Sequence, residues 1–526
     1  MSDQAAQREN SQMTQATPRT PNRTFRGPAG AGAPRLNSLP GVDRAEVAPR
    51  EVLEIERYDT DDHRLAAAGV VLVFHQGTRE GEQAQWRLDL AEGEGGEHLR
   101  VPLAADAGNP PAVPSELVAL VRGIVRERAL RPSGRIRRVR IETRLRDAGD
   151  RLFATVVHDH VTVATLGRST DVESWTDVEL RAAAADDELV TELEQRITES
   201  GLQKADTDAE AELDRLMRTA SPPAREATPG KPGSAGAALV GYIAEHTDRL
   251  AAEDLRVRRG EPDAVHQMRV ASRRVRSALQ AFRRLLDREK IDPLVDELRE
   301  LGQALAPARD AEVLRERISE GLRDLDPELR MGPVEQQVTR YFARREAEAG
   351  AAVLSTLDGD RYARLRTALD DLVRNPPFTE RAPRPARKEL PRLVARTARR
   401  LELAVKTALD PARPAEERDE AVHAARKAGK RLRYATEVAE PAVGKDAKRF
   451  AKTLKGFQTA LGEHQDTVVA RDALRELGAL AHSGGVNGFS FGVLHGKDAE
   501  RAARIEEDLP RLWKKAWTRR NRRWLS

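Results

Sequence analysis

The sequence of 526 residues contains no cysteine. Disulfide bonds, thiolate metal sites and cysteine nucleophiles are therefore excluded, and the absence agrees with a reducing compartment. Aromatic residues make up only 4% of the chain, and no apolar run approaches the roughly 18 residues of a membrane span. The N-terminal segment is polar and lacks the apolar core of a secretory signal. These absences predict a cytoplasmic protein with no membrane partner.

Charged residues make up 33% of the chain, yet the net charge is only +4. Any basic surface must therefore come from the placement of Arg and Lys and not from their number. The apolar share of 39% is enough for true hydrophobic cores. Abundant Ala, Leu, Arg and Glu with few aromatics favours helices over most of the chain.

Two changes of composition divide the chain. Residues 1–19 are rich in Gln, Ser and Thr and predict a disordered tail. Pro, Gly and Ser are concentrated over Ser221–Gly236, which predicts a linker at residues 218–236. Period-two alternation before the linker changes to a helical period after it. The fold class is therefore α+β, with an antiparallel β domain over residues 20–217 followed by an all-α domain over residues 237–520.

The strands expected before the linker are short and are separated by turn residues. They are Val70–Phe74, Gln85–Leu90, Ile136–Thr143, Leu152–Val157 and Val161–Leu166, with helical patterns at Ser115–Leu130 and Asp187–Ser200.

The helical region contains an internal duplication. The string VHQMRVASRRVR around His266 matches VHAARKAGKRLR around His423, and the two histidines lie 157 residues apart. Downstream, LAPARD ending at Asp310 matches LGEHQD ending at Asp466, at a spacing of 156 residues. This period is far too long for a solenoid. It predicts two related helical bundles, with repeat units over about 237–380 and 381–520.

The basic residues of each copy fall on one face of a helical wheel. In a helix over Val265–Leu286, the row extends to Arg283 and Arg284, with no acid among these positions. A solvated helix usually interleaves Glu with Arg, because like charges four residues apart repel. The rows are explained if a ligand supplies the counter-charge; a solvated basic face is the alternative. The rows contain Arg269, Arg273 and Arg276 in the first copy and Arg426, Lys430 and Arg433 in the second.

One histidine opens each row, His266 in the first and His423 in the second. Arginines three and seven residues after His266 make it a poor metal ligand, because nearby cations disfavour another cation. Two roles stay open for each histidine: a donor to phosphate, or a capping or packing residue.

These residues carry a resemblance to a known family. VHQMRVASRRVRSAL followed by ELRELGQALAPARDAEVL resembles the first half of a CHAD domain, the conserved histidine α-helical domain. DEAVHAARKAGKRLRY followed by LKGFQTALGEHQD resembles its second half. The resemblance runs from about Ala237 to Trp517. It implies two antiparallel bundles related by a pseudo-two-fold axis, with basic faces that bind inorganic polyphosphate.

The implied polyphosphate contacts are the histidines and basic residues of the two rows. Further candidates lie on the helix that opens the second unit and on later helices. The full set is His266, Arg269, Arg273, Arg276, His423, Arg426, Lys430 and Arg433, with Arg392, Arg396, Arg299 and Lys455.

The N-terminal region resembles a CYTH domain, the triphosphate-tunnel fold of class IV adenylyl cyclases and thiamine triphosphatases. The resemblance rests on Tyr58-Asp59-Thr60, Trp86-Arg87-Leu88 and the segment Trp175–Leu180. That family lines its tunnel with basic residues for the triphosphate and carboxylates for Mg²⁺ or Mn²⁺. Here the positions that the resemblance assigns to this lining are occupied by Thr20, Asn22, Thr24, Val73, His75 and Asp89.

The lining residues that remain are Arg137, Arg138 and Arg140, with Asp177 and Glu179. A divalent cation needs several oxygen ligands, and a single pair of carboxylates makes a poor site. Without metal and basic lining, the transferring phosphoryl group is not stabilised. We therefore expect a catalytically degenerate domain with no catalytic residues, no metal and no cofactor.

The sequence thus predicts non-enzymatic binding of inorganic polyphosphate, with association to polyphosphate granules. Two alternatives stay open: a metal-dependent triphosphatase acting on phosphate chains, and nucleic-acid binding by the same basic helices. Phe282 lies on the apolar side of its helix, and Tyr434 is the lone aromatic near the second row. Because readers of single-stranded nucleic acid stack bases on aromatic rings, nucleic acid is not the expected partner. Chain-length preference and oligomeric state are not set by the sequence.

Overall fold

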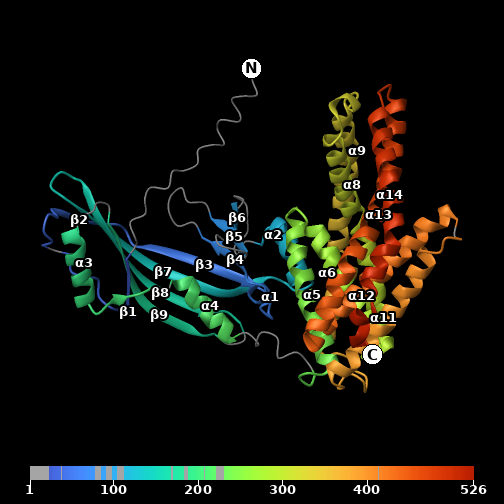
Figure 1. Ribbon diagram of the computed structural model, residues 1–526. Helices are drawn as coiled ribbons and strands as arrows, with labels where there is room; N and C mark the ends of the chain where they lie inside the picture. Colours follow the sequence, from blue (N-terminus) through green and yellow to red (C-terminus); the bar gives the residue numbers. More distant parts are fainter. Residues whose placement is uncertain are drawn as a thin grey trace. The chain divides into compact units, whose positions relative to one another are not determined.

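A computed structural model gives the structure of the chain. The predicted tail at residues 1–19 and residues 221–229 of the predicted linker lie outside the described residues. The chain forms two compact units, residues 1–118 with 127–224 and residues 119–126 with 225–526 (Figure 1). The residues described are 23–36, 38–76, 84–90, 97–102, 112–167, 170–182, 187–206, 208–220, 230–412 and 414–525.

The first unit is built on one antiparallel sheet with the strand order β10-β1-β9-β8-β7-β3-β4-β5-β6, and β2 pairs with β7 (Figure 1). The strands are β1 (Arg23–Pro28), β2 (Arg44–Val47), β3 (Glu51–Asp59), β4 (Val70–His75), β5 (Gln85–Leu90), β6 (Glu97–Pro102), β7 (Arg131–Arg146), β8 (Leu152–Thr165), β9 (Val172–Ala182) and β10 (Gln203–Lys204).

Strand β8 corrects one prediction, because the two strands expected at Leu152–Val157 and Val161–Leu166 are a single strand. The intervening residues 158–160 stay in register with β7 on one side and with β9 on the other. Because these polar residues pair with a strand on each side, the strand continues where the alternation pattern predicted a turn.

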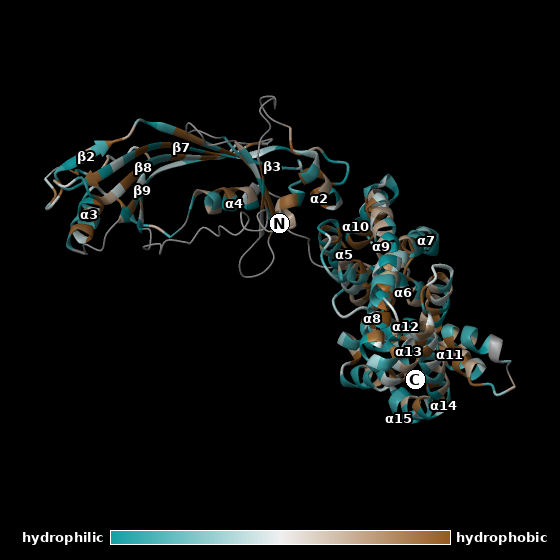
Figure 2. Cartoon of the chain, turned by 90° about the horizontal axis from the view of Figure 1, so that it is seen from above, coloured by the Kyte–Doolittle hydropathy of each residue, from teal (hydrophilic) through white to brown (hydrophobic). Residues whose placement is uncertain are grey.

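The helices of the first unit and its junction are α1 (Arg64–Ala67), α2 (Ser115–Val125), α3 (Asp187–Glu199) and α4 (Ala209–Ala220). Helix α2 ends five residues before the predicted Leu130, and Arg126 follows it with a left-handed φ of 59°. Helix α4 lies in a region for which no element was predicted. Figure 2 shows apolar residues on both α3 and α4.

Helices α3 and α4 cover opposite faces of the sheet. Residues opposite each other in register share a face, and neighbours along a strand alternate between faces. Val156 and Val178 form a core with α3, whereas Val161 and Trp175, on the other face of the same strands, form a core with α4. We call the second face the α4 face. Its other members include Arg57, Val73, Arg87, Gly134, Arg138, Arg140, Asp159 and Asp177.

The second unit is helical. Its helices are α5 (Ala235–Arg258), α6 (Ala264–Ala281), α7 (Arg288–Ala304), α8 (Ala306–Arg323), α9 (Val334–Asp358), α10 (Asp360–Arg374), α11 (Ala386–Ala408), α12 (Ala415–Val443), α13 (Lys445–Ser483), α14 (Phe489–Ala516) and α15 (Arg519–Arg522), with 3-10 turns at Pro327–Leu329 and Arg523–Leu525.

A pseudo-two-fold relation is visible where the two repeats begin. Helix α5 starts at the N-cap Ser234, whose side chain accepts a hydrogen bond from Ala237 N. The amide of Ala235 donates to Arg384 O at 2.8 Å, and the amide of Ala386 donates to Gly233 O at 2.9 Å. This reciprocal pair joins the starts of α5 and α11. The repeats also share one continuous hydrophobic core, so the two predicted bundles are fused and not separate.

Proline explains why the equivalent helices of the two repeats differ. In the first repeat, Pro307 follows the break at Leu305 that separates α7 from α8. The repeat-equivalent position holds Glu463, and α13 runs through it without interruption. Proline removes a backbone donor and is tolerated in the first turn of a helix. The same fold is thus built from two helices in one repeat and one in the other.

The ends of the helical hairpins α8–α9 and α13–α14 pack together beyond the shared core (Figure 1). Phe342 and Phe491 are fully buried in a separate apolar cluster between these hairpins. Along the described part of the chain, no helix is both long and apolar enough to cross a membrane.

Candidate functional site

Helices α6 and α12 contact each other and bring the two basic rows together. Arg273 of α6 acts electrostatically on both Arg426 and Lys430 of α12. Burial, together with the charges of Arg426, Arg273 and Arg269, lowers the pKa of Lys430 to about 7 against the opposing effect of Asp466. Burial also lowers the pKa of Arg276, with Arg431 and Arg273 as neighbouring cations. We call Arg273, Arg276 and Lys430 the inner cluster.

The outer end of each basic row has an acidic partner, which the sequence reasoning missed. Arg269 lies 3.0 Å from Asp310 of α8, and Arg426 lies 3.4 Å from Asp466 of α13. These aspartates end the two downstream repeat motifs, so the duplication pairs them with the rows. Among the described residues, no ion pair is found for Arg273, Arg276 or Lys430. Of the basic residues in the two rows, as far as the structure describes them, Arg273, Arg276 and Lys430 are thus the ones without an acidic partner.

Tyr434 is covered by cations. Its hydroxyl accepts a hydrogen bond from Arg273 Nε at 3.0 Å. The guanidinium carbons of Arg273 and Arg274 lie 5.8 Å from its ring centre, and that of Arg433 lies 6.0 Å away. The residue is only 4% exposed. Phe282 is fully buried, as predicted. Neither ring is available to stack on a base.

The two histidines are partly buried at the outer ends of the rows. Burial lowers the pKa of His266, and the charges of Arg309, Arg273 and Arg269 act in the same direction. Burial and the charge of Lys427 lower the pKa of His423, against a hydrogen bond with Gln465. Both imidazoles are therefore held neutral and can donate one N–H without adding charge.

Arg433 lies in a neutralised environment, although the sequence places it in the site. Glu437 lies 3.0 Å from Arg433 and 3.4 Å from Arg274, and it accepts a hydrogen bond from the Tyr242 hydroxyl at 2.9 Å. Arg433 therefore has a carboxylate partner, which it shares with Arg274.

The remaining candidates are exposed and are spread over several helices. Arg299 pairs with Asp296 at 3.2 Å on α7 and acts on Arg276. Arg392 and Arg396 lie on α11, and Lys455 lies on α13. The helix expected over Val265–Leu286 ends at Ala281. Arg283 and Arg284 therefore leave the row, and Arg283 pairs with Asp292 of α7 at 3.3 Å.

The α4 face of the first unit carries a row of four charges across β7, β8, β9 and β1. Arg140 donates to both oxygens of Asp159, at 2.9 and 2.8 Å. Arg26 donates to both oxygens of Asp177, at 2.8 and 3.1 Å. Glu179 is bonded by Arg181 at 2.6 Å. The carboxylates that remained as metal-ligand candidates are thus engaged by arginines.

Helix α4 occupies this face with acidic as well as apolar side chains. Asp214 pairs with Arg57, and Glu210 pairs with Arg87 at 2.6 Å. Gly134 allows the approach, because a Cβ atom there would lie 2.7 Å from Leu213 Cδ1.

Among the other lining positions, Asp89 pairs with Arg87 at 2.9 Å, and Thr24 lies opposite Glu179. Arg138 is half-buried on the α4 face, whereas Arg137 points to the opposite face and pairs with Glu54 at 3.1 Å. Val73 and His75 lie on the α4 face as well, and Thr20 and Asn22 lie outside the described residues.

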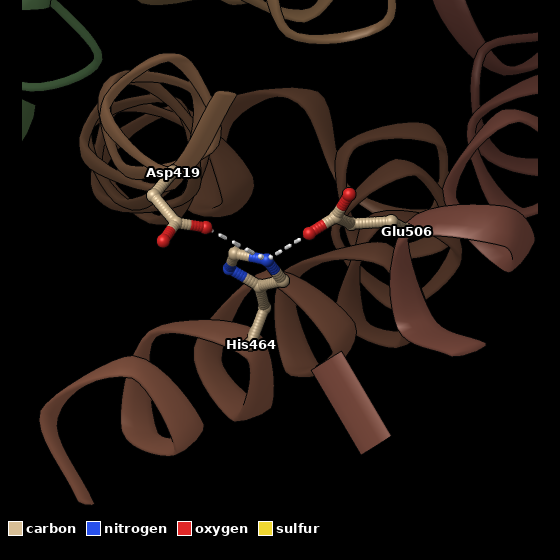
Figure 3. A group of neighbouring side chains, drawn as sticks. All are labelled: Asp419, His464 and Glu506. Atoms are coloured by element: carbon tan, nitrogen blue, oxygen red, sulfur yellow. Dashed lines mark hydrogen bonds and ion pairs between the residues drawn. The ribbon is translucent and has the colours of Figure 1, made fainter. Parts of the chain in front are cut away.

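One group of side chains in the second unit has the donor types of a metal site. His464 of α13 lies 2.9 Å from Glu506 of α14 and 3.5 Å from Asp419 of α12, measured from Nε2 (Figure 3). Arg418 lies 3.6 Å from Glu506, and Arg471 lies 3.6 Å from Asp419. Two guanidinium groups beside the carboxylates oppose a further dication. The group acts as a link between three helices.

Comparison with known proteins identifies relatives of both the whole chain and its parts. The family model described as CHAD domain matches residues 241–475. An uncharacterized protein of Mycobacterium tuberculosis is 32% identical over 495 residues, which are 91% of this chain and 92% of the relative.

Solved structures give lower similarity. PptA from Streptomyces chartreusis has a TM-score of 0.46 and 21% identity, covering 54% of this chain and 100% of its own. The CHAD domain from the plant Ricinus communis has a TM-score of 0.43 and 23% identity, and the match covers 56% of this chain and 96% of that domain. A candidate adenylate cyclase from Bacillus halodurans has a TM-score of 0.20 and 12% identity, and the match covers 31% of this chain and 81% of the cyclase chain.

Proposed function

The chain belongs to the CHAD domain family, and from this membership we propose that its helical unit binds inorganic polyphosphate and performs no chemistry on it. The first unit serves as a catalytically inactive companion of the CYTH type. We further propose that binding brings the protein to polyphosphate granules.

The observation that carries the proposal is the inner cluster. The two repeats contribute Arg273 and Arg276 from α6 and Lys430 from α12. The half-burial of these cations, side by side, costs free energy because like charges repel and desolvation penalises each of them. A chain with one negative charge per phosphate supplies the missing counter-charge along its length. Guanidinium and ammonium groups form their strongest hydrogen bonds with such anionic oxygens.

The α4 face supports a non-enzymatic role for the first unit. Phosphoryl transfer requires cations or metal aimed at the transferring group. Here Arg26 and Arg140 are committed to Asp177 and Asp159, and α4 lies across the same face. A triphosphate at this face would have to displace intramolecular ion pairs and an apolar helix contact.

The buried Tyr434 supports polyphosphate over nucleic acid. Stacking on aromatic rings is worth about 1–3 kcal/mol per base in single-strand binders. With its hydroxyl bonded to Arg273 and its ring covered, Tyr434 offers no stacking surface beside the inner cluster. Phosphate contacts alone remain, and these are what polyphosphate offers most densely.

The proposal is tested by titrating the full-length protein with long-chain polyphosphate at fixed ionic strength, because counterion release makes such affinities salt-dependent. The variant carries Arg273→Ala with Lys430→Ala. We expect binding weaker by about 3 kcal/mol or more, since each charge-assisted contact is worth about 1.5–3 kcal/mol.

The matched control carries Arg344→Ala with Arg504→Ala, which removes two basic side chains at exposed positions, each in an i,i+4 pair. It should bind within about three-fold of the parent. Circular dichroism verifies that both variants fold. Equal affinity of the folded inner-cluster variant and the control would refute this site.

A further inference from the structure

The two ends of the α6–α12 contact differ in charge, although the repeat makes them equivalent in sequence position. With the spacing of 157 residues, Arg276 corresponds to Arg433, and Arg274 corresponds to Arg431. Each end thus receives one arginine from each helix. At the same repeat spacing, Gln280 at one end corresponds to Glu437 at the other. In the same way, Ser277 corresponds to Tyr434.

The end around Glu437 is filled, and its two arginines share one carboxylate. Its carboxylate lies 3.0 Å from Arg433 and 3.4 Å from Arg274, and it accepts the hydrogen bond from Tyr242. The ring of Tyr434 is buried beside these groups. An anion arriving here meets a carboxylate that already binds both arginines.

The end around Gln280 is cationic and open. An amide replaces the carboxylate and a serine replaces the tyrosine, and a cavity of about 370 Å³ lies here. Arg276 and Arg431 act on each other as like charges. Within the described residues, neither has an ion pair. The cavity lining comprises Ser277, Gln280, Ala281, Arg283, Asp292, Val295, Asp296, Thr397, Arg400, Ala428 and Arg431.

The acids of the cavity are already paired. Asp292 lies 3.3 Å from Arg283, and Asp296 lies 3.2 Å from Arg299. Arg400 and Arg431 are left to meet a ligand, with the hydroxyl groups of Ser277 and Thr397 as neutral donors in the lining.

On the basis of the proposed function, we propose that polyphosphate leaves the inner cluster at one end only. Its next phosphoryl groups then occupy the cavity lined by Arg400 and Arg431, of which Arg431 neighbours Arg276 of the inner cluster. The Glu437 end closes the path in the other direction. The bound chain therefore follows a one-sided track through a pseudo-symmetric domain. The lining contains no aromatic residue, so the cavity recognises phosphoryl groups and offers no stacking surface to a nucleoside.

The repeat supplies a matched pair of substitutions that tests this track. Arg276→Ala removes a free cation from the open end. Arg433→Ala removes the equivalent cation from the closed end, where Glu437 keeps Arg274 and Tyr242 as partners. With long-chain polyphosphate and full-length protein, we expect Arg276→Ala to weaken binding about ten-fold or more, and Arg433→Ala to change it by less than about three-fold.

A second pair exchanges the residues that distinguish the ends. Gln280→Glu introduces a carboxylate beside Arg431 and should weaken binding about ten-fold. Glu437→Gln releases Arg274 and Arg433 and should leave binding unchanged or tighter. Equal losses in Arg276→Ala and Arg433→Ala, or no loss in Gln280→Glu, would overturn the one-sided track while polyphosphate binding stands. Absence of binding by the parent protein would instead overturn the proposed function itself.

Discussion

At the scale of single residues, Lys430 is an unusual group of the second unit. It is a half-buried ammonium whose neighbours are Arg426, Arg273 and Arg269, and its pKa falls to about 7. An ordinary lysine has a value near 10.5. The cluster is thus held together at a cost in stability, which is expected where a binding site is arranged before its ligand arrives.

This depressed pKa predicts a pH dependence of stability. Between about pH 7 and pH 10.5 the unfolded chain holds a proton on Lys430 that the folded chain has lost, so the free energy of unfolding should rise with pH in this window. The slope should approach on the order of 1 kcal/mol per pH unit. Urea unfolding followed by circular dichroism, at pH 7 and pH 9, measures it.

The control for this prediction is Lys430→Met, which retains the apolar stem and removes the titrating group. Its unfolding free energy should depend less steeply on pH over the same window, and it should exceed that of the parent at pH 7. Identical slopes for the two proteins would contradict a depressed pKa at this position.

At the scale of elements, α4 determines what the first unit can do. Leu213 packs closely against β7 at Gly134, where a Cβ atom would lie 2.7 Å from Leu213 Cδ1 and would force that buried side chain to shift. The helix also supplies acids to Arg57 and Arg87 of the sheet. One amphipathic helix thus covers the apolar positions and neutralises basic positions of the same face.

Gly134→Ala should destabilise the first unit by about 1–3 kcal/mol, because the added methyl group overpacks the contact with Leu213. Gly32→Ala is the control, since a Cβ atom there has no neighbour within 4 Å; it should be neutral or slightly stabilising. Thermal unfolding measures both. Polyphosphate affinity should be unchanged in both variants. Equal stability of the two would show that α4 does not pack as described.

The His464 group links three helices and predicts a structural effect without metal. His464→Ala should destabilise the helical unit by about 2 kcal/mol or more, because it removes a buried side chain and a charge-assisted hydrogen bond to Glu506. Zn²⁺ should leave the unfolding temperature of the parent unchanged. A rise in that temperature with Zn²⁺, absent in His464→Ala, would show a metal site instead.

The sequence predicted the class of the elements better than their ends. Helix α6 stops at Ala281 and not at Leu286, and the strand β8 continues where alternation suggested a turn, because tertiary pairing determines both. The basic rows could be predicted, because the positions of Arg and Lys and their helical spacing are given by the sequence. Their pairing with Asp310 and Asp466 was not, because it depends on how α8 and α13 pack.

At the scale of the whole molecule, the duplicated domain and the sheet domain differ in whether the basic residues of their candidate sites are paired with carboxylates. The helical unit leaves Arg273, Arg276 and Lys430 without carboxylate partners among the described residues, whereas the α4 face commits Arg26 and Arg140 to aspartates. On the proposed function, the helical unit binds the anionic ligand, whereas the arginines of the α4 face bind the carboxylates Asp159 and Asp177 that a metal ion would need.

The full-length protein should therefore release no phosphate from ATP, thiamine triphosphate or tripolyphosphate with Mg²⁺ or Mn²⁺. Phosphate release is assayed against a metal-free sample, and against an Arg140→Ala variant prepared in parallel. Metal-dependent turnover by the parent that is lost in the variant would show that the α4 face is a working active site.

The measurement that tests the central claim most directly is a competition at fixed ionic strength. A preformed complex of the full-length protein with labelled long-chain polyphosphate is challenged with poly-uridylate or poly-adenylate at equal phosphate concentration. Because phosphate contacts alone are available beside the buried Tyr434, neither nucleic acid should displace the label at stoichiometric levels, whereas unlabelled polyphosphate should displace it. Displacement by either nucleic acid at equal phosphate would contradict the account.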